Sequence, residues 1–159
     1  MVMLSLTACQ AQEKKKDKKS AGKELSQSPP VTKTDAEWRQ VLTQEQFDVL
    51  RNKATERPFT GEYYKHFEKG VYACAACGNP LFKSDAKFDS ECGWPSFDQA
   101  IEKSVIYKED STHGMTRTEV MCANCGGHLG HVFDDGPEET TGNRFCTNSV
   151  SIKFIPAKK

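Results

Sequence analysis

The sequence predicts a mainly β domain of antiparallel sheets that begins with short helices. From Gly70 onward, apolar and polar residues alternate in short runs with turn residues between them, which is typical of strands with one buried face. Before Gly70, two segments combine a helix-start signature with apolar residues at helical spacing. The chain has 159 residues, enough for a single domain with its own core.

Two capping boxes mark where the helices are expected to begin. Thr34-Asp-Ala-Glu37 and Thr43-Gln-Glu-Gln46 each place a threonine three residues before Glu or Gln, so that each side chain can bond the other residue's backbone N–H. Apolar residues follow at helical spacing, namely Trp38, Val41, Leu42, Phe47 and Leu50. Strands are expected further on, over residues 71–74, 105–108, 116–121 and, as the last strand, 144–154.

Four of the seven cysteines form two Cys-x-x-Cys pairs, Cys74/Cys77 and Cys122/Cys125. One such turn directs two thiolates at one ion, and two turns complete a tetrahedral Cys₄ site for zinc. Two unrelated pairs or disulfides are the alternatives, but the strand-like runs around each pair favour the metal. Since four sulfurs leave no open position on zinc, the ion is expected to stabilise the fold, and catalysis is expected elsewhere.

The first 32 residues differ in composition from the rest of the chain. Met1–Cys9 is apolar, and Leu6-Thr-Ala-Cys9 resembles a bacterial lipobox, although a basic start and a longer apolar run are missing, as if the start codon lay downstream of the true one. From Gln10 to about Val31, Lys, Glu, Ser, Gln and Pro predominate. We therefore expect residues 1–32 to be a truncated lipoprotein-type signal and a disordered Lys-rich linker, and residues 33–157 to be the folded domain.

The expected location depends on Cys9. If Cys9 carries lipid, the protein is anchored to the bacterial cell envelope, and the alternative is a tail with one stray cysteine on a cytoplasmic protein. No apolar stretch has the length needed to span a bilayer. The 22 Lys and Arg residues balance 22 Asp and Glu residues, so no overall basic field favours nucleic acid as a partner. A monomer is expected.

Cys146 is the first candidate for a reactive thiol. Because strand side chains alternate, a continuous strand over 144–154 places these residues on one face: Cys146, Asn148, Val150, Ile152 and Phe154. A thiol reacts as the thiolate, so the pKa of Cys146 is expected to be lowered by nearby groups, for which the candidates are Arg144, Asn148, His128 and His131. The alternative is an inert cysteine in the core.

Cys92 is the second candidate. It lies in a Gly- and Pro-containing segment, Glu91–Phe97, which is expected to be a loop from which its sulfur can reach a partner thiol and resolve a sulfenic acid. Beside it, Trp94 offers a flat apolar surface suited to a methyl–sulfur group. An unreactive loop thiol and an ordinary core tryptophan are the alternatives.

Two histidines follow the second cysteine pair. His128 comes two glycines after Cys125, and His131 lies three residues further, so a bound metal fixes the backbone that carries both imidazoles. Either imidazole is suited to supplying a proton near neutral pH. Metal ligation by a histidine is disfavoured because four thiolates already fill the shell.

Five motifs in this order resemble the methionine-R-sulfoxide reductase B family: Cys74-Ala-Ala-Cys77, Cys92-Gly-Trp-Pro-Ser-Phe97, Cys122-Ala-Asn-Cys125, His128-Leu-Gly-His-Val-Phe133 and Arg144-Phe-Cys-Thr-Asn148. The resemblance covers roughly Lys33 to Pro156. It implies a domain of the Mss4-like β-tent type with one structural Zn²⁺ per chain. The chain departs from the family pattern in two places: Asp134 stands where many members carry proline, and the loop before Gly142 is slightly longer.

The resemblance also implies an activity and residue roles. The activity is reduction of methionine (R)-sulfoxide, mainly in proteins, which repairs oxidative damage. Cys146 is implied as the nucleophile and Cys92 as the resolving thiol, and a thioredoxin-like partner reopens their disulfide. The other implied catalytic residues are His131 and Asn148, which orient or polarise the sulfoxide oxygen, and His128 and Asp135. The implied substrate-binding residues are Trp94, Phe97 and Arg144.

Two other functions compete with this one. The first is a zinc-ribbon binding module that recognises protein or nucleic acid through its surface, in which Cys92 and Cys146 are incidental. The balance of positive and negative charges disfavours this function. A zinc hydrolase or deaminase needs an open metal position and a His-x-Glu motif paired with Pro-Cys-x-x-Cys, and the sequence lacks that paired motif.

Overall fold

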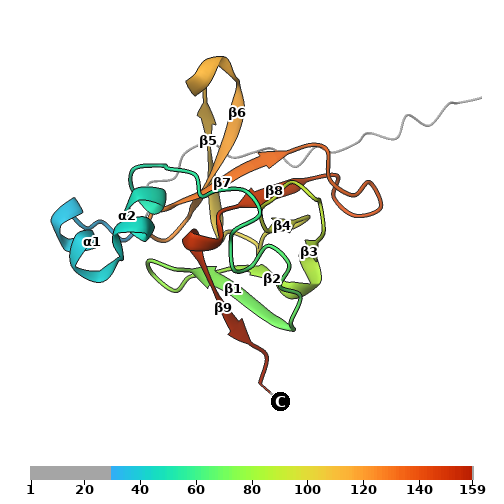
Figure 1. Ribbon diagram of the computed structural model, residues 1–159, viewed down its shortest axis with the longest axis horizontal. Coiled ribbons are helices and arrows are strands. Elements are labelled where there is room, and N and C mark those ends of the chain that lie inside the picture. Colours follow the sequence, from blue (N-terminus) through green and yellow to red (C-terminus); the bar gives the residue numbers. More distant parts are fainter. Residues whose placement is uncertain (1–29, 159) are drawn as a thin grey trace, which may run out of the picture.

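The computed structural model describes residues 30–158, so the predicted lipid attachment at Cys9 and nearly all of the predicted linker lie outside the described residues. Within residues 30–158, two short helices precede two antiparallel sheets, and the helices lie together at one side of the molecule (Figure 1). No helix in this part of the chain has the length and apolar character needed to cross a membrane. The predicted mainly β class with short N-terminal helices is confirmed.

Both helices begin where the capping boxes predict. α1 spans Asp35–Val41 and α2 spans Gln44–Leu50, and each is preceded by its threonine with both reciprocal capping contacts formed. Each helix has 7 residues, too few to be stable alone, so it depends on the packing of its apolar side chains. Trp38 is 1% exposed, whereas Val41 is 61% exposed. The buried face of α1 is therefore narrower than the apolar pattern predicts.

The strands form two antiparallel sheets (Figure 1). The smaller sheet has the order β2-β1-β9, with strands Pro80–Lys83 (β2), Gly70–Cys74 (β1) and Ile152–Pro156 (β9). The larger sheet has the order β3-β4-β8-β7-β6-β5, with strands Lys87–Phe88 (β3), Ser96–Phe97 (β4), Arg144–Thr147 (β8), His128–Phe133 (β7), Arg117–Cys122 (β6) and Val105–Asp110 (β5). Short 3₁₀ turns span Ser84–Ala86 (η1), Thr112–Gly114 (η2) and Ser149–Ser151 (η3). The strands predicted near 71–74, 105–108 and 116–121 are β1, β5 and β6.

One hydrophobic core joins the helices to both sheets. Buried side chains from all of them form a single cluster that includes Trp38, Phe47, Tyr72, Phe82, Phe97, Leu129 and Phe145. Phe82 of β2 and Phe97 of β4 stack with ring centroids 4.3 Å apart, which joins the two sheets. Burying a side chain of this size contributes about 1.5–3 kcal/mol. The core thus fixes the strands that carry the functional residues.

The prediction of one continuous last strand over 144–154 is wrong. After β8 the chain makes the turn η3 and enters the other sheet as β9. The strand breaks because the Glu56 carboxylate accepts hydrogen bonds from the N–H groups of Ser149 and Val150, at 2.7 and 3.0 Å, so these groups do not continue the ladder. β8 also lies inside the larger sheet, between β4 and β7, and does not present Cys146 at an edge.

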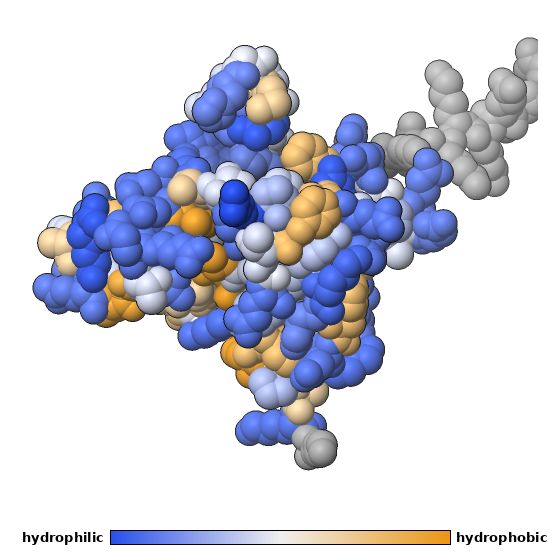
Figure 2. Space-filling model, in the orientation of Figure 1, coloured by the Kyte–Doolittle hydropathy of each residue, from blue (hydrophilic) through white to orange (hydrophobic). Residues whose placement is uncertain are grey.

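Large apolar side chains on the surface are separated from one another. Figure 2 shows hydrophilic residues over most of the visible face, with hydrophobic residues in small groups. Among the described residues, the exposed large hydrophobic side chains come from different segments and are Val41, Phe59, Phe67, Met115 and Ile155. Scattered residues of this kind are normal on protein surfaces and do not indicate a large apolar interface.

Candidate active site and metal centre

Four cysteine thiols converge between the two sheets. Cys74 ends β1 and Cys122 ends β6, and each Cys-x-x-Cys segment forms the turn of a hairpin, β1–β2 or β6–β7. In both turns the glycine after the second cysteine donates its N–H to the carbonyl of the first cysteine at 2.8 Å. These glycines, Gly78 and Gly126, have φ angles of 78° and 70°, a conformation that favours glycine. The two turns are therefore built alike.

The sulfur positions fit a single metal ion. The four Sγ atoms all lie within 4.8 Å of one another, with Cys74 and Cys125 at 3.7 Å and Cys77 and Cys122 at 3.6 Å. A tetrahedral ion with metal–sulfur bonds of about 2.3 Å needs sulfur–sulfur distances of roughly 3.8 Å. Because the four ligands come from both sheets, an ion bound by them links the sheets.

Cys146 lies in the middle of the larger sheet. Its cross-strand partners are Ser96 of β4 on one side and His131 of β7 on the other, so the three side chains share one face of the sheet. Gly130 allows β7 to approach β8 closely, because a Cβ atom there would come within 1.9 Å of the Cys146 carbonyl oxygen. The sheet thus fixes the Cys146 sulfur between a hydroxyl group and an imidazole.

Cys92 brings a second thiol to Cys146. It lies in the loop before β4, and the Sγ atoms of the two free cysteines are 3.6 Å apart. Ser90 Oγ donates a hydrogen bond to Cys92 Sγ at 3.0 Å. Because a disulfide has an S–S distance of about 2.05 Å, a movement of roughly 1.5 Å would join the two sulfurs. The structure therefore brings together the two thiols predicted to form the redox pair.

The two thiols differ in protonation. The hydrogen bond from Cys146 lowers the pKa of Cys92 to about 4, with smaller contributions from Ser90 and Ser96 and against the effect of burial. The same contact with Cys92, together with burial, raises the pKa of Cys146, and Arg144 only partly opposes this. Cys146 therefore keeps its proton in this arrangement of the thiols, contrary to the expected lowering of its pKa.

A cavity of about 120 Å³ opens beside Cys146. Its lining includes the ring of Trp94, the amide of Asn148 and both imidazoles, His128 and His131. A larger cleft of about 390 Å³ near residues 98–107 is lined by neither cysteine nor histidine. We assign the chemistry to the smaller cavity because it holds a thiol, two imidazoles and an amide together.

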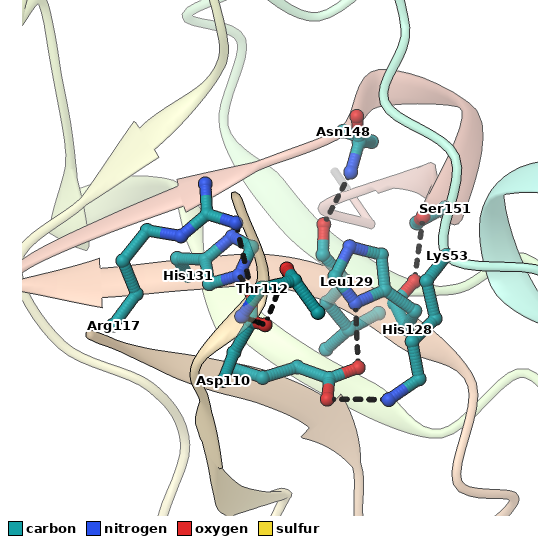
Figure 3. A network of polar contacts seen from close by, with 10 residues as sticks. Lys53, Asp110, Thr112, Arg117, His128, Leu129, His131, Asn148 and Ser151 are labelled. Carbon is teal, nitrogen blue, oxygen red and sulfur yellow. Dashed lines mark hydrogen bonds and ion pairs between the residues drawn. The ribbon is translucent and has the colours of Figure 1, made fainter. Parts of the chain in front are cut away.

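The His131 imidazole is held by a carboxylate. Its Nε2 lies 2.7 Å from Asp110 Oδ2, to which Arg117 Nη2 also donates at 2.9 Å (Figure 3). The other oxygen of Asp110 accepts hydrogen bonds from the hydroxyl and N–H groups of Thr112, which lower the pKa of Asp110. Burial lowers the pKa of His131, and the Asp110 contact opposes that effect. Asp110 thus fixes the His131 ring through Nε2, and Nδ1 of the ring makes no contact with Asp110.

His128 is held in a similar way and is more deeply buried. Its Nδ1 lies 2.8 Å from Glu119 Oε1, and Lys53 Nζ lies 2.7 Å from the other oxygen of Glu119 (Figure 3). Burial raises the pKa of Glu119, but the hydrogen bonds from His128 and Lys53 outweigh burial and lower the pKa overall. Each histidine therefore has its own carboxylate, and each carboxylate has its own cation.

Main-chain groups orient the Asn148 amide. Its Oδ1 accepts a hydrogen bond from the Glu56 N–H at 3.0 Å, and its Nδ2 donates to the Leu129 carbonyl at 3.0 Å (Figure 3 shows the second contact). An amide nitrogen carries two N–H groups, so these contacts leave one N–H for a ligand in the cavity. The main chain of Glu56 also fixes Trp94, because Trp94 Nε1 donates to the Glu56 carbonyl at 3.2 Å.

Phe97 does not line the cavity, and its predicted role in substrate binding is corrected. It is 0% exposed and stacks on Phe82 in the core. Alternation along β4 explains its position. Ser96 pairs with Cys146 on the cavity face, so Phe97 pairs with Phe145 on the core face.

Arg144 and Asp135 form an ion pair that does not line the cavity. Arg144 Nε and Nη2 donate to the two Asp135 oxygens at 2.8 and 2.9 Å, and this contact raises the pKa of Arg144. The Arg144 guanidinium favours the charged form of Cys146. The position of Arg144 supports an indirect, electrostatic effect on Cys146 in place of the predicted substrate contact. Asp135, predicted to be catalytic, contacts Arg144 and does not line the cavity.

Several residues that hold the site together were not found from the sequence: Lys53, Glu56, Asp110, Arg117 and Glu119. One signal was present, because Glu119 is a charged residue inside a predicted strand, and it proves to be 2% exposed. Lys53 and Glu56 have no local signal, since their side-chain partners lie 66 to 94 residues away along the chain.

Comparisons with known proteins identify the family. The SelR domain matches residues 42–156. The peptide methionine sulfoxide reductase MsrB of Agrobacterium fabrum is 58% identical over 130 residues, which cover 81% of this chain and 96% of the relative. The chain belongs to the methionine-R-sulfoxide reductase B family. The resemblance predicted from the five motifs is therefore confirmed.

Other relatives and one solved structure are also similar. The proteins of the same name from Hahella chejuensis and Chromohalobacter salexigens are 58% and 53% identical, over 80% and 82% of this chain and 91% and 99% of the relatives. A crystal structure of the Mis18 "Yippee-like" domain matches with a TM-score of 0.47 and 16% identity, over 58% of this chain and 100% of that domain.

Proposed function

We propose that this chain reduces methionine-R-sulfoxide, mainly in proteins, and so repairs oxidative damage. The observation that carries the proposal is the pair of free thiols, Cys146 and Cys92, whose sulfurs lie 3.6 Å apart beside a cavity with two imidazoles and an amide. The relatives named peptide methionine sulfoxide reductase MsrB, at 53–58% identity, support the same oxidoreductase activity. A binding module or a hydrolase gives no reason for two thiols in this position.

The cavity groups suit a methyl sulfoxide. Trp94 packs against the methyl end, because methyl and sulfur groups bind well to aromatic rings. The sulfoxide oxygen accepts the remaining N–H of Asn148 and a proton-bearing nitrogen of His131. Cys146 then faces the sulfur. The sulfoxide sulfur is a stereocentre, so three fixed contacts around it select one epimer.

The proposed reaction moves two electrons from the thiols to the substrate. Cys146 Sγ attacks the sulfoxide sulfur while His131 protonates the oxygen, and the Cys146 proton replaces the one that His131 gives. The resulting hydroxyl group passes to Cys146, which becomes a sulfenic acid, and the thioether is released. The Cys92 thiolate attacks the sulfur of this sulfenic acid and forms the disulfide, and the displaced hydroxyl group takes a proton from His131 and leaves as water. A thioredoxin-like dithiol then reduces the disulfide.

Substrate binding activates Cys146 in this proposal. The hydrogen bond to Cys92 is the largest cause of the raised pKa of Cys146. When the sulfur turns toward a bound sulfoxide, this hydrogen bond breaks, and the Arg144 guanidinium then favours the thiolate. The nucleophile therefore forms only when a sulfoxide is present to receive it.

We infer that the four clustered cysteines bind one structural Zn²⁺. Four thiolates suit zinc and leave no position for substrate. The ligands are Cys74, Cys77, Cys122 and Cys125. Zinc bound there stabilises the contact between the two sheets and takes no part in the reaction.

The location and the oligomeric state are also proposals. The lipobox-like segment Leu6-Thr-Ala-Cys9 supports lipid attachment at Cys9, which anchors the protein to the bacterial cell envelope. Mass spectrometry of the protein from its native host tests this, and an unmodified Cys9 thiol contradicts it in favour of the cytoplasm. A monomer is expected in sedimentation analysis.

A single-turnover assay tests the proposed function. The reduced protein is mixed with each epimer of N-acetyl-methionine sulfoxide amide, and accessible thiols are counted under native conditions before and after the reaction. We expect the R epimer to consume two thiols per chain and the S epimer to consume none. Equal reaction of both epimers, or reduction without thiol loss, contradicts the proposal.

A further inference from the structure

Glu56 is a buried carboxylate that the proposed reaction does not use. It is 8% exposed and is the only buried residue within residues 51–60. Among the residues that the structure describes, no ion pair involves it. Its two oxygens instead accept the N–H groups of Ser149 and Val150 at the start of η3. Burial raises the pKa of Glu56. A carboxylate buried without a cation is unfavourable, which points to a specific role.

The backbone of Glu56 contacts both groups that orient the substrate in the proposed function. Its N–H donates to Asn148 Oδ1 at 3.0 Å, and its carbonyl accepts from Trp94 Nε1 at 3.2 Å. The neighbouring residue, Thr55, lines the cavity. One residue therefore fixes the spacing between the amide that binds the oxygen and the ring that binds the methyl group.

The Glu56 N–H also determines which end of the Asn148 amide faces the cavity. A half-turn of an asparagine amide exchanges its oxygen and its nitrogen. Here the amide oxygen meets the Glu56 donor and the nitrogen meets the Leu129 acceptor, so only one orientation satisfies both neighbours. That orientation presents an N–H group, which is what a sulfoxide oxygen requires.

We propose that Glu56 is a positioning residue for sulfoxide binding: its carboxylate holds η3 and thereby fixes its own backbone between Asn148 and Trp94. The inference rests on the proposed function and gives Glu56 no contact with substrate. The packing around the carboxylate is tight, because a Cβ atom on Gly61 would lie 2.6 Å from Glu56 Oε1. Loss of the carboxylate leaves two N–H groups of η3 without their acceptor and frees the backbone that spaces the amide and the ring.

Two substitutions test the proposal against a matched control. Glu56→Ala removes both acceptors, Glu56→Gln keeps one oxygen, and Glu62→Ala removes an exposed carboxylate from the same segment. Kinetics with the R epimer are measured well below the Tm of each variant, with zinc content as the check of folding. We expect kcat/KM to fall on the order of 10–100-fold in E56A, because misplacement of about 1 Å has that effect, and to fall less in E56Q. E62A should match the parent protein.

A fluorescence measurement separates positioning from stability. The chain has two tryptophans, so Trp38→Phe leaves Trp94 as the only source of tryptophan emission. In that background we expect Glu56→Ala and Glu56→Gln to change the Trp94 emission spectrum and to reduce its response to added sulfoxide. A lower Tm with unchanged kcat/KM and unchanged Trp94 emission overturns the proposal.

The outcome for Glu56 is distinguishable from the outcome for the proposed function. If the parent protein does not reduce either epimer, the proposed function fails. The Trp94 spectrum without substrate still tests whether the Glu56 carboxylate positions the ring. If the parent protein is active and both Glu56 variants keep its kcat/KM, only the positioning role fails.

Discussion

The six described cysteines occupy two regions that are built in different ways. In the proposed metal cluster, four thiols come from two similar hairpin turns and their Sγ atoms all lie within 4.8 Å; its residues are Cys74, Cys77, Cys122 and Cys125. In the redox pair, Cys146 comes from inside the larger sheet and Cys92 from a loop, with their Sγ atoms 3.6 Å apart. A sulfur–sulfur distance of about 3.6 Å therefore occurs in both regions, but different backbone elements hold it.

This difference shows how the fold can support the proposed division of its cysteines into metal ligands and a reactive pair. A metal ion needs four fixed distances, and two rigid turns from different sheets supply them. A redox pair needs one distance that can shorten to about 2.05 Å, and a loop cysteine opposite a strand cysteine supplies that movement. The two regions should therefore respond independently to substitution.

Replacing Cys146, the proposed nucleophile, should have the largest effect and should affect the redox pair alone. Cys146→Ser is expected to lower the reductase rate by at least roughly 10³-fold, because a hydroxyl group is a much poorer nucleophile at neutral pH. Zinc content and Tm should stay at parent values. Activity assays and metal analysis on the same sample measure both, and loss of zinc in this variant contradicts the independence of the regions.

The reciprocal substitution should affect the metal cluster first. Cys74→Ser is expected to lower the free energy of unfolding by several kcal/mol or to prevent folding, because structural zinc contributes on the order of 10 kcal/mol in small domains. Thermal unfolding followed by circular dichroism, with and without a chelator, measures the change. A Tm equal to that of the parent protein would show that the cluster does not stabilise the fold.

Replacing Cys92, the loop cysteine, should separate the two proposed steps, which are formation of the sulfenic acid and formation of the disulfide. Cys92→Ser is expected to complete one turnover and then to stop, because the sulfenic acid on Cys146 has no thiol to displace its hydroxyl group. Multiple-turnover activity with a thioredoxin-like dithiol should fall roughly 10²-fold or more. Trapping with dimedone and mass spectrometry detects the intermediate. A variant that cycles at the parent rate rules out the resolving role.

A smaller effect is expected where a carboxylate supports the imidazole. Asp110 favours the charged form of His131, against burial and against the charges of Arg117 and His128. Asp110→Asn should therefore lower the pKa of His131, so that the protonated form is lost at lower pH. The alkaline side of the kcat/KM profile should shift to lower pH, with a loss of about tenfold at pH 7. Glu109→Gln, at an exposed neighbouring position, is the control, and an unshifted profile in D110N contradicts the role.

Replacing Glu119 should have the smallest effect on activity. Its main effect should be on the stability of the protein in acid. Its pKa is lowered from the ordinary value of 4.5, so its contribution to stability is present above that pH and is lost as the pH falls through the lower folded-state pKa. Glu119→Gln should reduce stability at pH 7 by about 1.5–3 kcal/mol and flatten the loss of stability in acid. Urea unfolding from pH 3 to 7 measures both changes. An unchanged slope in acid excludes this contribution.

Local signals in the sequence predicted local structure. The two capping boxes predicted both helix starts, and the Cys-x-x-Cys spacing predicted both turns, because each feature depends on residues at most four apart. That Cys92 and Cys146 lie close together was predicted only through a resemblance of ordered motifs, since the sequence alone does not place a loop cysteine against a strand, and the structure places their sulfurs 3.6 Å apart. The helix starts and the two turns are confirmed because a short pattern determines their geometry, whereas the redox roles of Cys92 and Cys146 stay predictions.

The errors arose where distant residues determine the geometry. Alternation in the sequence predicts a last strand that continues past Asn148, whereas the N–H groups of Ser149 and Val150 bind the distant Glu56 carboxylate. The motif that Phe97 shares with Trp94 predicts a position near substrate, although alternation on β4 directs the Phe97 side chain into the core. No short-range pattern encodes such partners.

The pairing of β1 with β9 has a consequence for synthesis of the protein. Gly70 pairs with Pro156 and Cys74 with Ile152, so a strand translated early must wait for one translated much later. A nascent chain cannot close the smaller sheet until β9 has left the ribosomal exit tunnel. Until then one edge of β1 is unpaired and can bind other extended chains. A chaperone that covers this edge during synthesis would prevent such aggregation.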